Sequence, residues 1–325
     1  MNCILSFILP CYNVARYIGE CIDSLYAQNM PETEFEVICV DDCSTDNTVE
    51  VIKEYQQKHS NIILHCHELN QTAGGARNTG MSLAKGEYIW FVDPDDAICK
   101  ESLKPLLDKM RSDNLDMLLF NYFDADVNLN VLRRDNTFSD SALSSGQDFV
   151  MQYFPQNIST LGLVWRCIYK KSFLQDKSLR YPQIRKSQDV VFAWKTLLSA
   201  ERMASISQAY YVFRSNPNSV THAAKTPLVL YSERFQFGAE VDGIIRGFSL
   251  RNEIRCQLER VRRWCANPDW SEIKALPKAG REEYRRYLNS DKRMIVRLAK
   301  YMNKKTMLMI LAATNSALWN KILDK

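Results

Sequence analysis

The chain has 325 residues, of which 46% are apolar and 25% are charged, and its formal net charge is +4. These values are ordinary for a soluble globular protein, and the sequence contains no internal repeat or low-complexity segment. The ten cysteines are scattered, several of them in apolar segments where free cysteine packs as a small hydrophobe. We therefore expect a reducing, cytoplasmic setting. The opening residues MNCILSFILPCYN have no basic start and only a short apolar run, which predicts neither a signal peptide nor a spanning helix.

Strand-like and helix-like segments alternate over the first hundred residues. Four apolar runs predict buried strands: CILSFILPCYN, FEVICVDD, NIILHCHEL and EYIWFVD. Apolar residues at helical spacing predict helices between them, over 15–28, 48–59 and 74–86. Strands that are apolar throughout and alternate with helices indicate a mostly parallel sheet with helices on both faces.

The pattern continues less regularly after residue 100. We expect helices at 100–114 and 187–201, strands at 115–124 and 209–214, and a strand or turn that enters a helix at 161–174. Residues 124–148 are polar and predict an irregular excursion, and everything after about residue 226 predicts helix.

Polar residues follow all four predicted N-terminal strands. In open sheets of this kind, ligands bind outside the carboxyl ends of the strands. We therefore expect these polar residues to share one edge of the sheet. They are Pro10, Tyr12 and Asn13 after the first strand, Asp41 and Asp42 after the second, Asn70, Gly74 and Gly75 after the third, and Asp93 and Asp95 after the fourth.

The stretch FVDPDD places Asp93, Asp95 and Asp96 together, where their charges repel one another. A divalent cation removes that conflict, and Mg²⁺ or Mn²⁺ prefers such oxygen ligands, usually with substrate phosphates completing the site. The alternative is a turn with a helix cap, since aspartate and proline favour turns. On spacing alone the two interpretations have equal weight.

Two further segments indicate a nucleotide ligand. Asp41 or Asp42 is suited to accept hydrogen bonds from a base imide or a ribose hydroxyl. In NQTAGGARNTG, small residues such as Gly75 let a ligand approach a helix start, where unpaired N–H groups favour anions. Arg77 either touches a diphosphate or braces the aspartate loop, and both interpretations stay open.

Together these residues resemble the family 2 inverting glycosyltransferases with the GT-A fold. The matching pieces occur in family order over residues 1–100, with weaker similarity to about residue 225. They are FILPCYN, VDDCSTDNT, NQTAGGARNTG and FVDPDD, followed by VWRCIYKKSFL, SQDVVF and YYVFRSNPNSVTH.

The resemblance implies a Rossmann-like sheet and a nucleotide-sugar donor, commonly a UDP-sugar, with a saccharide or lipid-linked saccharide as acceptor. Asp189 would be the general base and Asp95 the main ligand of Mn²⁺ or Mg²⁺. Because His222 follows the last predicted strand, its position indicates a further metal ligand contributed by a loop. Donor-binding residues would be Pro10, Tyr12, Asn13, Asp41, Asp42, Gly75, Arg77 and Asp93. The expected domains are a catalytic domain at 1–225, with donor (1–100) and acceptor (101–225) halves, and a basic helical extension at 226–325.

Two residues depart from the family pattern. Cys43 replaces a common glycine, which suggests that this position tolerates a side chain. Gln188 replaces the usual glutamate before Asp189, which removes a like charge and lowers the expected rise in the pKa of the base. A degenerate transferase that only binds nucleotide therefore stays open as an alternative. A sugar nucleotidyltransferase is disfavoured because PCYNVARY offers no glycine-rich loop after the first strand, and a receiver-like signalling domain because its acidic pair follows its first strand.

Basic residues are concentrated near the C-terminus. Residues 251–305 contain sixteen Lys or Arg against seven Asp or Glu, a net charge of +9, which leaves −5 on the rest of the chain. Basic and apolar residues at helical spacing suit peripheral contact with the anionic inner face of a cell membrane, or another polyanionic partner. A solvated helical face packed back on the catalytic domain is the equal alternative. No nucleic-acid partner is expected.

Overall fold

The structure is a computed structural model. It describes residues 3–155, 164–215, 227–267, 270–275, 278–290, 295–296, 298–315 and 319. His222, one of the predicted metal ligands, lies outside these residues.

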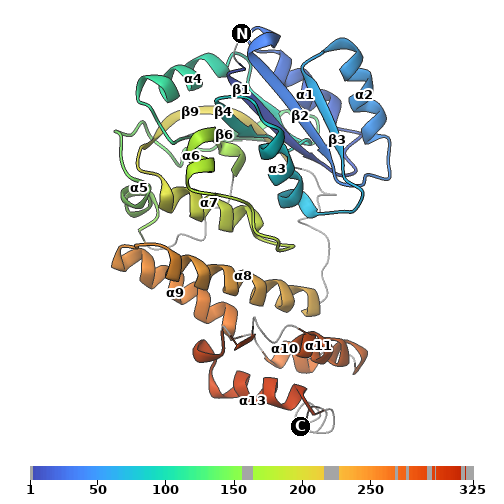
Figure 1. Cartoon of the computed structure of the whole chain (residues 1–325), viewed down its shortest axis with the longest axis vertical. Helices are drawn as coiled ribbons and strands as arrows, with labels where there is room; N and C mark the ends of the chain where they lie inside the picture. The colour runs from blue at the N-terminus through green and yellow to red at the C-terminus, as the bar shows by residue number, and fades with distance from the viewer. Residues whose placement is uncertain are drawn as a thin grey trace.

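One mixed sheet of nine strands organises the first 215 residues, within the part of the chain that the structure describes (Figure 1). Its parallel half has the order β3-β2-β1-β4, and β8, β6, β9 and β5 follow, with β7 paired to β6. The pairs β1–β2, β2–β3, β1–β4 and β6–β9 are parallel, and the others are antiparallel. The strands are β1 (Leu5–Cys11), β2 (Phe35–Asp41), β3 (Ile62–Cys66), β4 (Tyr88–Phe91), β5 (Ala97–Ile98), β6 (Met117–Ala125), β7 (Val131–Arg134), β8 (Cys167–Lys170) and β9 (Met203–Arg214).

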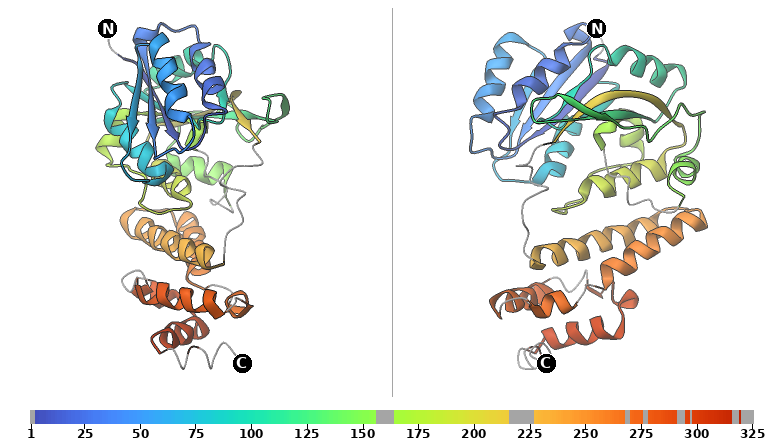
Figure 2. Two further views of the ribbon diagram at one scale, coloured as in Figure 1. Left: turned by 90° about the vertical axis from the view of Figure 1, so that its right-hand side faces the viewer. Right: turned by 180° about the vertical axis from the view of Figure 1, so that it is seen from behind.

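Helices cover both faces of this sheet (Figure 2). Alternate residues of β1 point to opposite faces. Phe7 therefore belongs to a core with α1 (Ile18–Tyr26), α2 (Thr48–Lys58) and α4 (Leu103–Ser112). Ile8 belongs to the opposite core, which also contains residues of α3 (Thr72–Leu83), α5 (Gly146–Tyr153), α6 (Lys171–Asp176) and α7 (Gln188–Ser199).

The predicted elements of the first hundred residues are confirmed with small shifts at their ends. The burial predicted for the third strand is wrong: β3 is the edge strand of the sheet, and only its first residue is buried. Two later predictions need correction. The irregular excursion predicted at 124–148 contains β7, which pairs with β6, and the first turn of α5. The last strand begins at Met203 rather than near residue 209, because its first residues pair with β6 from Met117 onward. This long-range pairing leaves no local signature in the sequence.

The C-terminal helices form a layer beneath the sheet domain (Figures 1 and 2). They are α8 (Pro227–Gly247), α9 (Asn252–Ala266), α10 (Trp270–Ala275), α11 (Lys278–Ser290) and α13 (Lys304–Ala313). Val241 and Ile244 of α8 join the core that contains α7, whereas Phe235 and Ala239 join a separate core with Trp270. The helix α8 thus connects the sheet domain to the terminal helices. None of the helices in the described ranges has the length and apolar character needed to cross a membrane.

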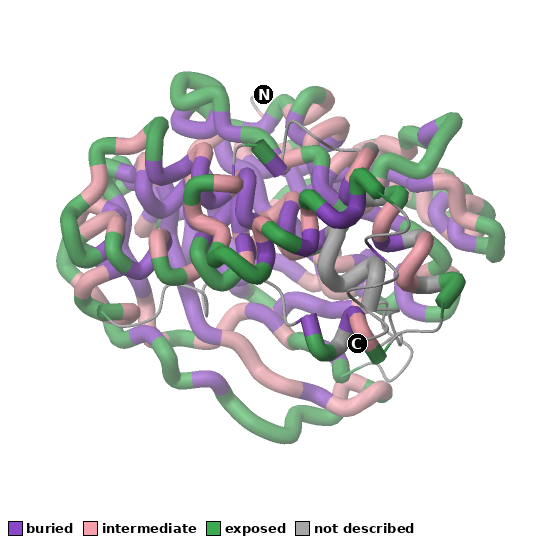
Figure 3. The backbone as a smooth tube through the Cα atoms, turned by 90° about the horizontal axis from the view of Figure 1, so that it is seen from below, coloured by how far each residue is buried: buried purple, intermediate pink, exposed green. Residues whose placement is uncertain are grey.

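Burial follows this layered arrangement. In the view from below, the central strands are buried, and exposed residues gather on the outer helices and loops (Figure 3). Residues 5–11 and 35–41 are buried throughout, as expected for parallel strands covered on both sides. The carboxyl ends of these strands carry the polar residues described next.

Candidate functional site

The first three strands end side by side. The parallel register pairs Cys11 with Asp41 and Asp41 with Cys66, so the loops that follow lie against each other. The loop after β1 is held to the loop after β2 by hydrogen bonds, one of them from the Thr45 N–H to Asn13 Oδ1 at 2.7 Å. Tyr12 is 45% exposed on the same loop. Pro10 is buried within β1 itself.

Asp41 and Asp42 have different surroundings, although both are buried. Asp41 Oδ2 accepts from the Ser44 N–H at 3.1 Å, but Asp41 Oδ1 is buried without a hydrogen-bond partner in the described structure. Asp42 Oδ1 accepts from the Gln71 N–H at 2.7 Å and lies 2.8 Å from His67 Nδ1. Because an unsatisfied buried carboxylate oxygen is costly, Asp41 is the better placed of the two to accept a ligand's N–H or O–H group.

The sequence reasoning missed His67, because it interpreted residues 65–67 only as part of a strand. Its Nε2 lies 2.9 Å from Thr79 Oγ1, so the ring joins the Asp42 loop to α3. With Nδ1 protonated, the ring donates to Asp42 and accepts from the Thr79 hydroxyl, which satisfies both nitrogens. Its spacing of 25 residues from Asp42 gives no sequence signal, and only strand pairing brings the two together.

Cys43 adopts a backbone conformation that favours glycine. Its φ is 68°, in the left-handed region. This conformation accounts for the glycine that is common at this position in the family that the sequence resembles. A side chain is accommodated here, as expected, but only with a strained backbone. The Cys43 thiol lies 3.3 Å from the carbonyl oxygen of His67, so the side chain has one polar contact in return for the strained backbone.

The carboxylates after β4 separate into distinct environments. Asp93 Oδ1 lies 2.6 Å from Arg77 Nη2, and this arginine is buried. Asp96 is also buried and accepts from the Tyr211 hydroxyl and from the Arg214 N–H, both at 2.7 Å. Burial, and next the charges of Asp95 and Asp93, raise the pKa of Asp96 well above its ordinary value. Asp96 therefore ties the loop to β9 and does not cap a helix. The turn of the alternative interpretation is present, because the Asp96 N–H donates to the Asp93 carbonyl oxygen at 3.0 Å.

Asp95 lies between these two residues and is partly buried. The side chain of Arg214 fixes its main chain, because Arg214 Nε donates to the Asp95 carbonyl oxygen at 2.6 Å. Arg214 Nη2 also lies 2.6 Å from a carboxylate oxygen of Glu20 on α1. Tyr211 and Arg214 thus hold the carboxylate loop in place. Both lie in the segment YYVFRSNPNSVTH that resembles the family, but the sequence reasoning gave them no role.

Asp189 occupies the first turn of α7, two residues after Ser187, whose φ is 58°. Burial raises the pKa of the Asp189 carboxyl above its ordinary value, while the positive charge of Arg77 acts to lower it and Asp93 to raise it. Asp189, Arg77 and Asp93 therefore lie within electrostatic reach of one another. A carboxylate poised in this way is suited to accept a proton.

The α3 helix start packs closely on α7. Gln188 Oε1 accepts from the Thr72 hydroxyl at 3.0 Å. A Cβ atom on Gly74 would lie only 2.2 Å from Gln188 Oε1, and one on Gly75 only 2.5 Å from Gln71 Cβ. The two glycines thus permit close contacts within the protein. Nothing in this geometry by itself places a ligand on Gly75.

No group of three His, Cys, Asp or Glu side chains in the described parts of the chain is arranged to hold a metal ion. Asp95 still suits Mg²⁺ or Mn²⁺, because it offers carboxylate oxygens beside the carboxylates of Asp93 and Asp96. Such a cation takes most of its ligands from substrate phosphates and water. Metal binding by Asp95 stays a prediction.

Comparison with known proteins places this geometry in a family. The family description Glycosyl transferase family 2 matches residues 6–178, more than half of the chain. The chain belongs to this family. The resemblance inferred from the motifs is thereby confirmed, and the chain is a glycosyltransferase.

Several bacterial glycosyltransferases of the family are similar in sequence. The uncharacterized glycosyltransferase EpsJ of Bacillus subtilis is 27% identical over 73% of this chain and 69% of its own length. The poly(ribitol-phosphate) beta-N-acetylglucosaminyltransferase TarS of Staphylococcus aureus is 34% identical over 63% of this chain, but the match spans only 35% of TarS. A poly(ribitol-phosphate) beta-glucosyltransferase of Bacillus spizizenii is 31% identical over 63% of this chain and 31% of its own length.

Solved structures confirm the GT-A fold predicted from the sequence. The crystal structure of TarS 1–349 in complex with UDP-GlcNAc has a TM-score of 0.65 and 24% identity, covering 99% of this chain and 90% of that one. The mannosyltransferase PcManGT of Pyrobaculum calidifontis, in complex with GDP-Man and Mn²⁺, has a TM-score of 0.53 and 16% identity, covering 99% and 88% of the two chains.

Proposed function

We propose that this glycosyltransferase transfers a sugar, with inversion, from a UDP-sugar to a saccharide or lipid-linked saccharide acceptor in surface polysaccharide synthesis. The observation that carries the proposal is the electrostatic grouping of Asp189, Arg77 and Asp93 at the edge where Asp41 has its unsatisfied carboxylate oxygen. Similarity to TarS, which was crystallised with UDP and UDP-GlcNAc, supports a UDP-sugar donor.

The residues divide the chemistry among them. Asp41 would accept the imide N–H of the base, with Asp42 held beside it by His67, and Tyr12 and Asn13 would border the nucleoside. Asp189 would take the proton of the acceptor hydroxyl as that oxygen attacks the anomeric carbon from the face opposite the leaving group. Arg77 pairs with Asp93 and holds its positive charge close to the general base Asp189.

The departing nucleoside diphosphate develops negative charge. Bound Mn²⁺ or Mg²⁺, held by Asp95 and the donor phosphates, would neutralise that charge. The proposed ligand His222 lies outside the described residues. The chain's own contribution is the rigid loop around Asp95, fixed by Arg214 and by the hydrogen bonds of Asp96 to β9.

Gln188 does not count against catalysis. Its side chain is bonded to Thr72 and packed against Gly74, so it serves the contact between α3 and α7. Asp189, the next residue, is influenced instead by the charges of Arg77 and Asp93. Family membership also leaves no support for a sugar nucleotidyltransferase or a signalling receiver.

The decisive experiment compares the purified protein with its Asp189→Asn and Asp95→Asn variants. UDP release from UDP-GlcNAc and UDP-glucose is measured with Mn²⁺ and a set of surface-polysaccharide acceptors, and UDP affinity is measured by calorimetry. We expect Asp189→Asn to lose at least about 100-fold in turnover while keeping UDP affinity. Asp95→Asn should lose the metal dependence of UDP binding. Full turnover in both variants would refute the proposal.

The terminal helices suit a peripheral position on the cytoplasmic face of a membrane. On α13, Lys304, Lys305, Leu308 and Leu311 are all exposed, which combines basic and apolar side chains on one surface. Co-flotation with anionic vesicles, lost in a Leu308→Ser, Leu311→Ser double variant, would support this part of the proposal. Equal flotation with neutral vesicles would contradict it. The division into a domain at 1–225 and an extension at 226–325 is likewise part of the proposal.

A further inference from the structure

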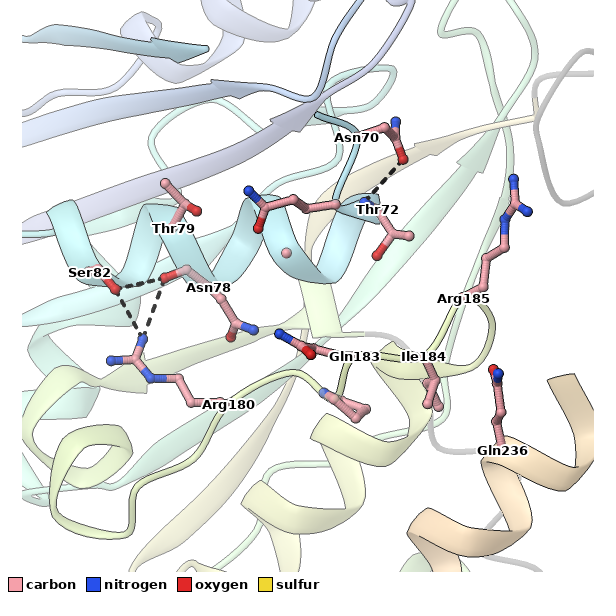
Figure 4. Close-up of a pocket in the computed structure, with 13 residues that line it drawn as sticks. Asn70, Thr72, Asn78, Thr79, Ser82, Arg180, Gln183, Ile184, Arg185 and Gln236 are labelled. Carbon is pink, nitrogen blue, oxygen red and sulfur yellow. Dashed lines mark hydrogen bonds between the residues drawn. The ribbon is translucent and has the colours of Figure 1, made fainter. Parts of the chain in front are cut away.

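A groove of about 750 Å³ lies alongside α3 (Figure 4). One end of it reaches Asn70 and Gln71, which donate hydrogen bonds to Asp42 at the sheet edge. One wall is a stripe of α3 from Thr72 to Ser82, and the other is the segment 180–185 that precedes α7. Gln236 of α8 closes the lower side. Eleven residues of helix give the groove a length of about 16 Å, which suits an extended ligand better than a compact one.

The lining is polar and carries positive charge. Arg185 lies toward the Thr72 end of the groove, and Arg180 lies beside Ser82 at the other end (Figure 4). Both arginines are exposed. The other polar lining residues carry amides and hydroxyls, and none of the described residues that line the groove is acidic. Two guanidinium groups with no carboxylate beside them in the lining favour an anionic ligand, because guanidinium matches carboxylate and phosphate geometry.

The walls are held rigidly before any ligand binds. Asn78 of α3 accepts from the Tyr181 N–H at 2.9 Å and donates to the Tyr181 carbonyl oxygen at 3.0 Å. The Tyr181 ring stacks on Phe192 of α7, with centroids 4.0 Å apart and planes 4° from parallel. This bracing fixes Arg180 next to the helix, so a ligand that binds here meets a preformed surface.

The groove also adjoins the proposed base. Thr72 lines the groove and donates to Gln188, and Asp189 is the next residue. The Thr72 end of the groove therefore borders the first turn of α7, which contains Asp189. Among the described residues, Gly75 is the one expected donor-binding residue in the lining, and Asp41, Tyr12 and Asn13 lie outside it, so we assign the groove to the acceptor.

We propose that this groove binds an extended acceptor bearing repeated anionic groups, phosphate or carboxylate, held by Arg180 and Arg185. The inference rests on the proposed function, since it assigns the acceptor class of the same enzyme. The two arginines position the acceptor chain and take no part in the chemistry.

The test uses three defined probes and calorimetry at low ionic strength. Short-chain polyphosphate carries phosphates, oligogalacturonate carries carboxylates, and a dextran oligomer carries neither. We expect the wild type to bind the anionic probes and not dextran, and the tighter of the two identifies the acceptor anion. An Arg180→Gln, Arg185→Gln double variant should bind that probe about tenfold more weakly, and Arg180→Lys, Arg185→Lys should recover part of the loss.

Arg260→Gln is the matched control, because Arg260 is exposed on α9 and lies outside the groove. It should bind the probes as the wild type does. Unchanged binding in the double glutamine variant would overturn the inference, because the anion would then bind elsewhere on the basic surface. Equal affinity for dextran would overturn it as well.

UDP affinity is measured on the same protein samples, so that the two proposals fail separately. If UDP binds with Mn²⁺ but the double variant keeps its anion affinity, the groove assignment is wrong and the transferase proposal stands. If neither UDP nor UDP-sugars bind, the transferase proposal fails, whatever the anionic probes do.

Discussion

At the scale of single residues, the site depends on charges that are balanced in pairs. Arg77 is buried and lies 2.6 Å from Asp93, and its charge also reaches Asp189. The base is therefore subject to two opposing effects: burial raises its pKa and the guanidinium lowers it. Removing the arginine should therefore raise the pKa of Asp189.

The pH dependence of turnover follows from this balance. Because only deprotonated Asp189 accepts a proton, turnover should rise with pH through the pKa of this group, above the ordinary aspartate value of about 3.9. In Arg77→Gln the pKa rises further, so the acidic limb of the profile of log kcat against pH should move to higher pH. Arg77→Lys keeps the charge and should move it less. A shift to lower pH in Arg77→Gln would contradict this account.

Cys43 carries a conformational strain that glycine would relieve. Its φ of 68° is costly for a residue with a Cβ, so Cys43→Gly should raise the free energy of unfolding by about 1 kcal/mol. Urea unfolding measures the change. Cys66→Gly is the control: Cys66 ends β3 and has no positive φ, so glycine there should destabilise by about 0.5–1 kcal/mol. Destabilisation by both substitutions would show that the contact of the Cys43 thiol with His67 outweighs the strain.

At the scale of elements, the contact between α3 and α7 aligns the donor edge with the base. Gly74 permits that contact, because a Cβ there would lie 2.2 Å from Gln188 Oε1 and 3.1 Å from Tyr181 Cβ. The hydrogen bond from Thr72 to Gln188 then fixes the first turn of α7. Asp189 is therefore positioned by the packing of α3 on α7 as well as by the loop that precedes α7.

Substitution of Gly74 by alanine should therefore damage both stability and turnover. We expect Gly74→Ala to lower the free energy of unfolding by about 1–3 kcal/mol, since the packed Gln188 side chain must move. Turnover should fall more than UDP affinity does. Gly19→Ala on α1 is the control, because the nearest atom to its Cβ would be the Tyr55 hydroxyl oxygen at 3.3 Å, and alanine favours helix. Equal losses of stability in the two variants would contradict the argument.

At the scale of the whole molecule, a buried ion pair links the C-terminal helices. Asp242 of α8 has a fully buried side chain that accepts from Arg262 of α9 at 2.9 Å and from the Tyr301 hydroxyl at 3.1 Å. Arg246 donates to the same carboxylate. Burial would raise the pKa of Asp242, but these donors lower it overall. The helical layer is thus held together by a charge that must stay ionised.

Asp242→Asn should destabilise the molecule by about 3 kcal/mol, because the buried Arg262 then keeps, among the described residues, only the more distant carboxylate of Glu259, 3.8 Å away. Thermal unfolding measures the loss. Since the pKa of Asp242 is lowered on folding, its contribution is fully present above the ordinary aspartate pKa and is lost as pH falls through the folded value. The stability difference between wild type and variant should therefore shrink in acid. Asp108→Asn breaks only an exposed pair with Lys104 and should cost well under 1 kcal/mol.

The sequence alone determined the elements of the first hundred residues and the edge at which the site lies. Unbroken apolar runs that alternate with helical segments indicate parallel strands covered on both faces, and the carboxyl ends of such strands meet. The burial holds for β1, β2 and β4, but not for the edge strand β3. Asp41, Asp42, Asp93 and Asp95 could therefore be assigned to one edge without coordinates. Four motifs in a fixed order then identified the family.

Tertiary structure decided which of these side chains remain open to a ligand. His67 engages Asp42, Arg77 pairs with Asp93, and Asp96 is bonded to β9, whereas Asp41 keeps an unsatisfied oxygen. The groove between α3 and segment 180–185 likewise depends on residues about a hundred positions apart. Local periodicity reports which face of an element is buried, but hydrogen-bond partners from distant strands are fixed only when the sheet pairs and the helices pack on it.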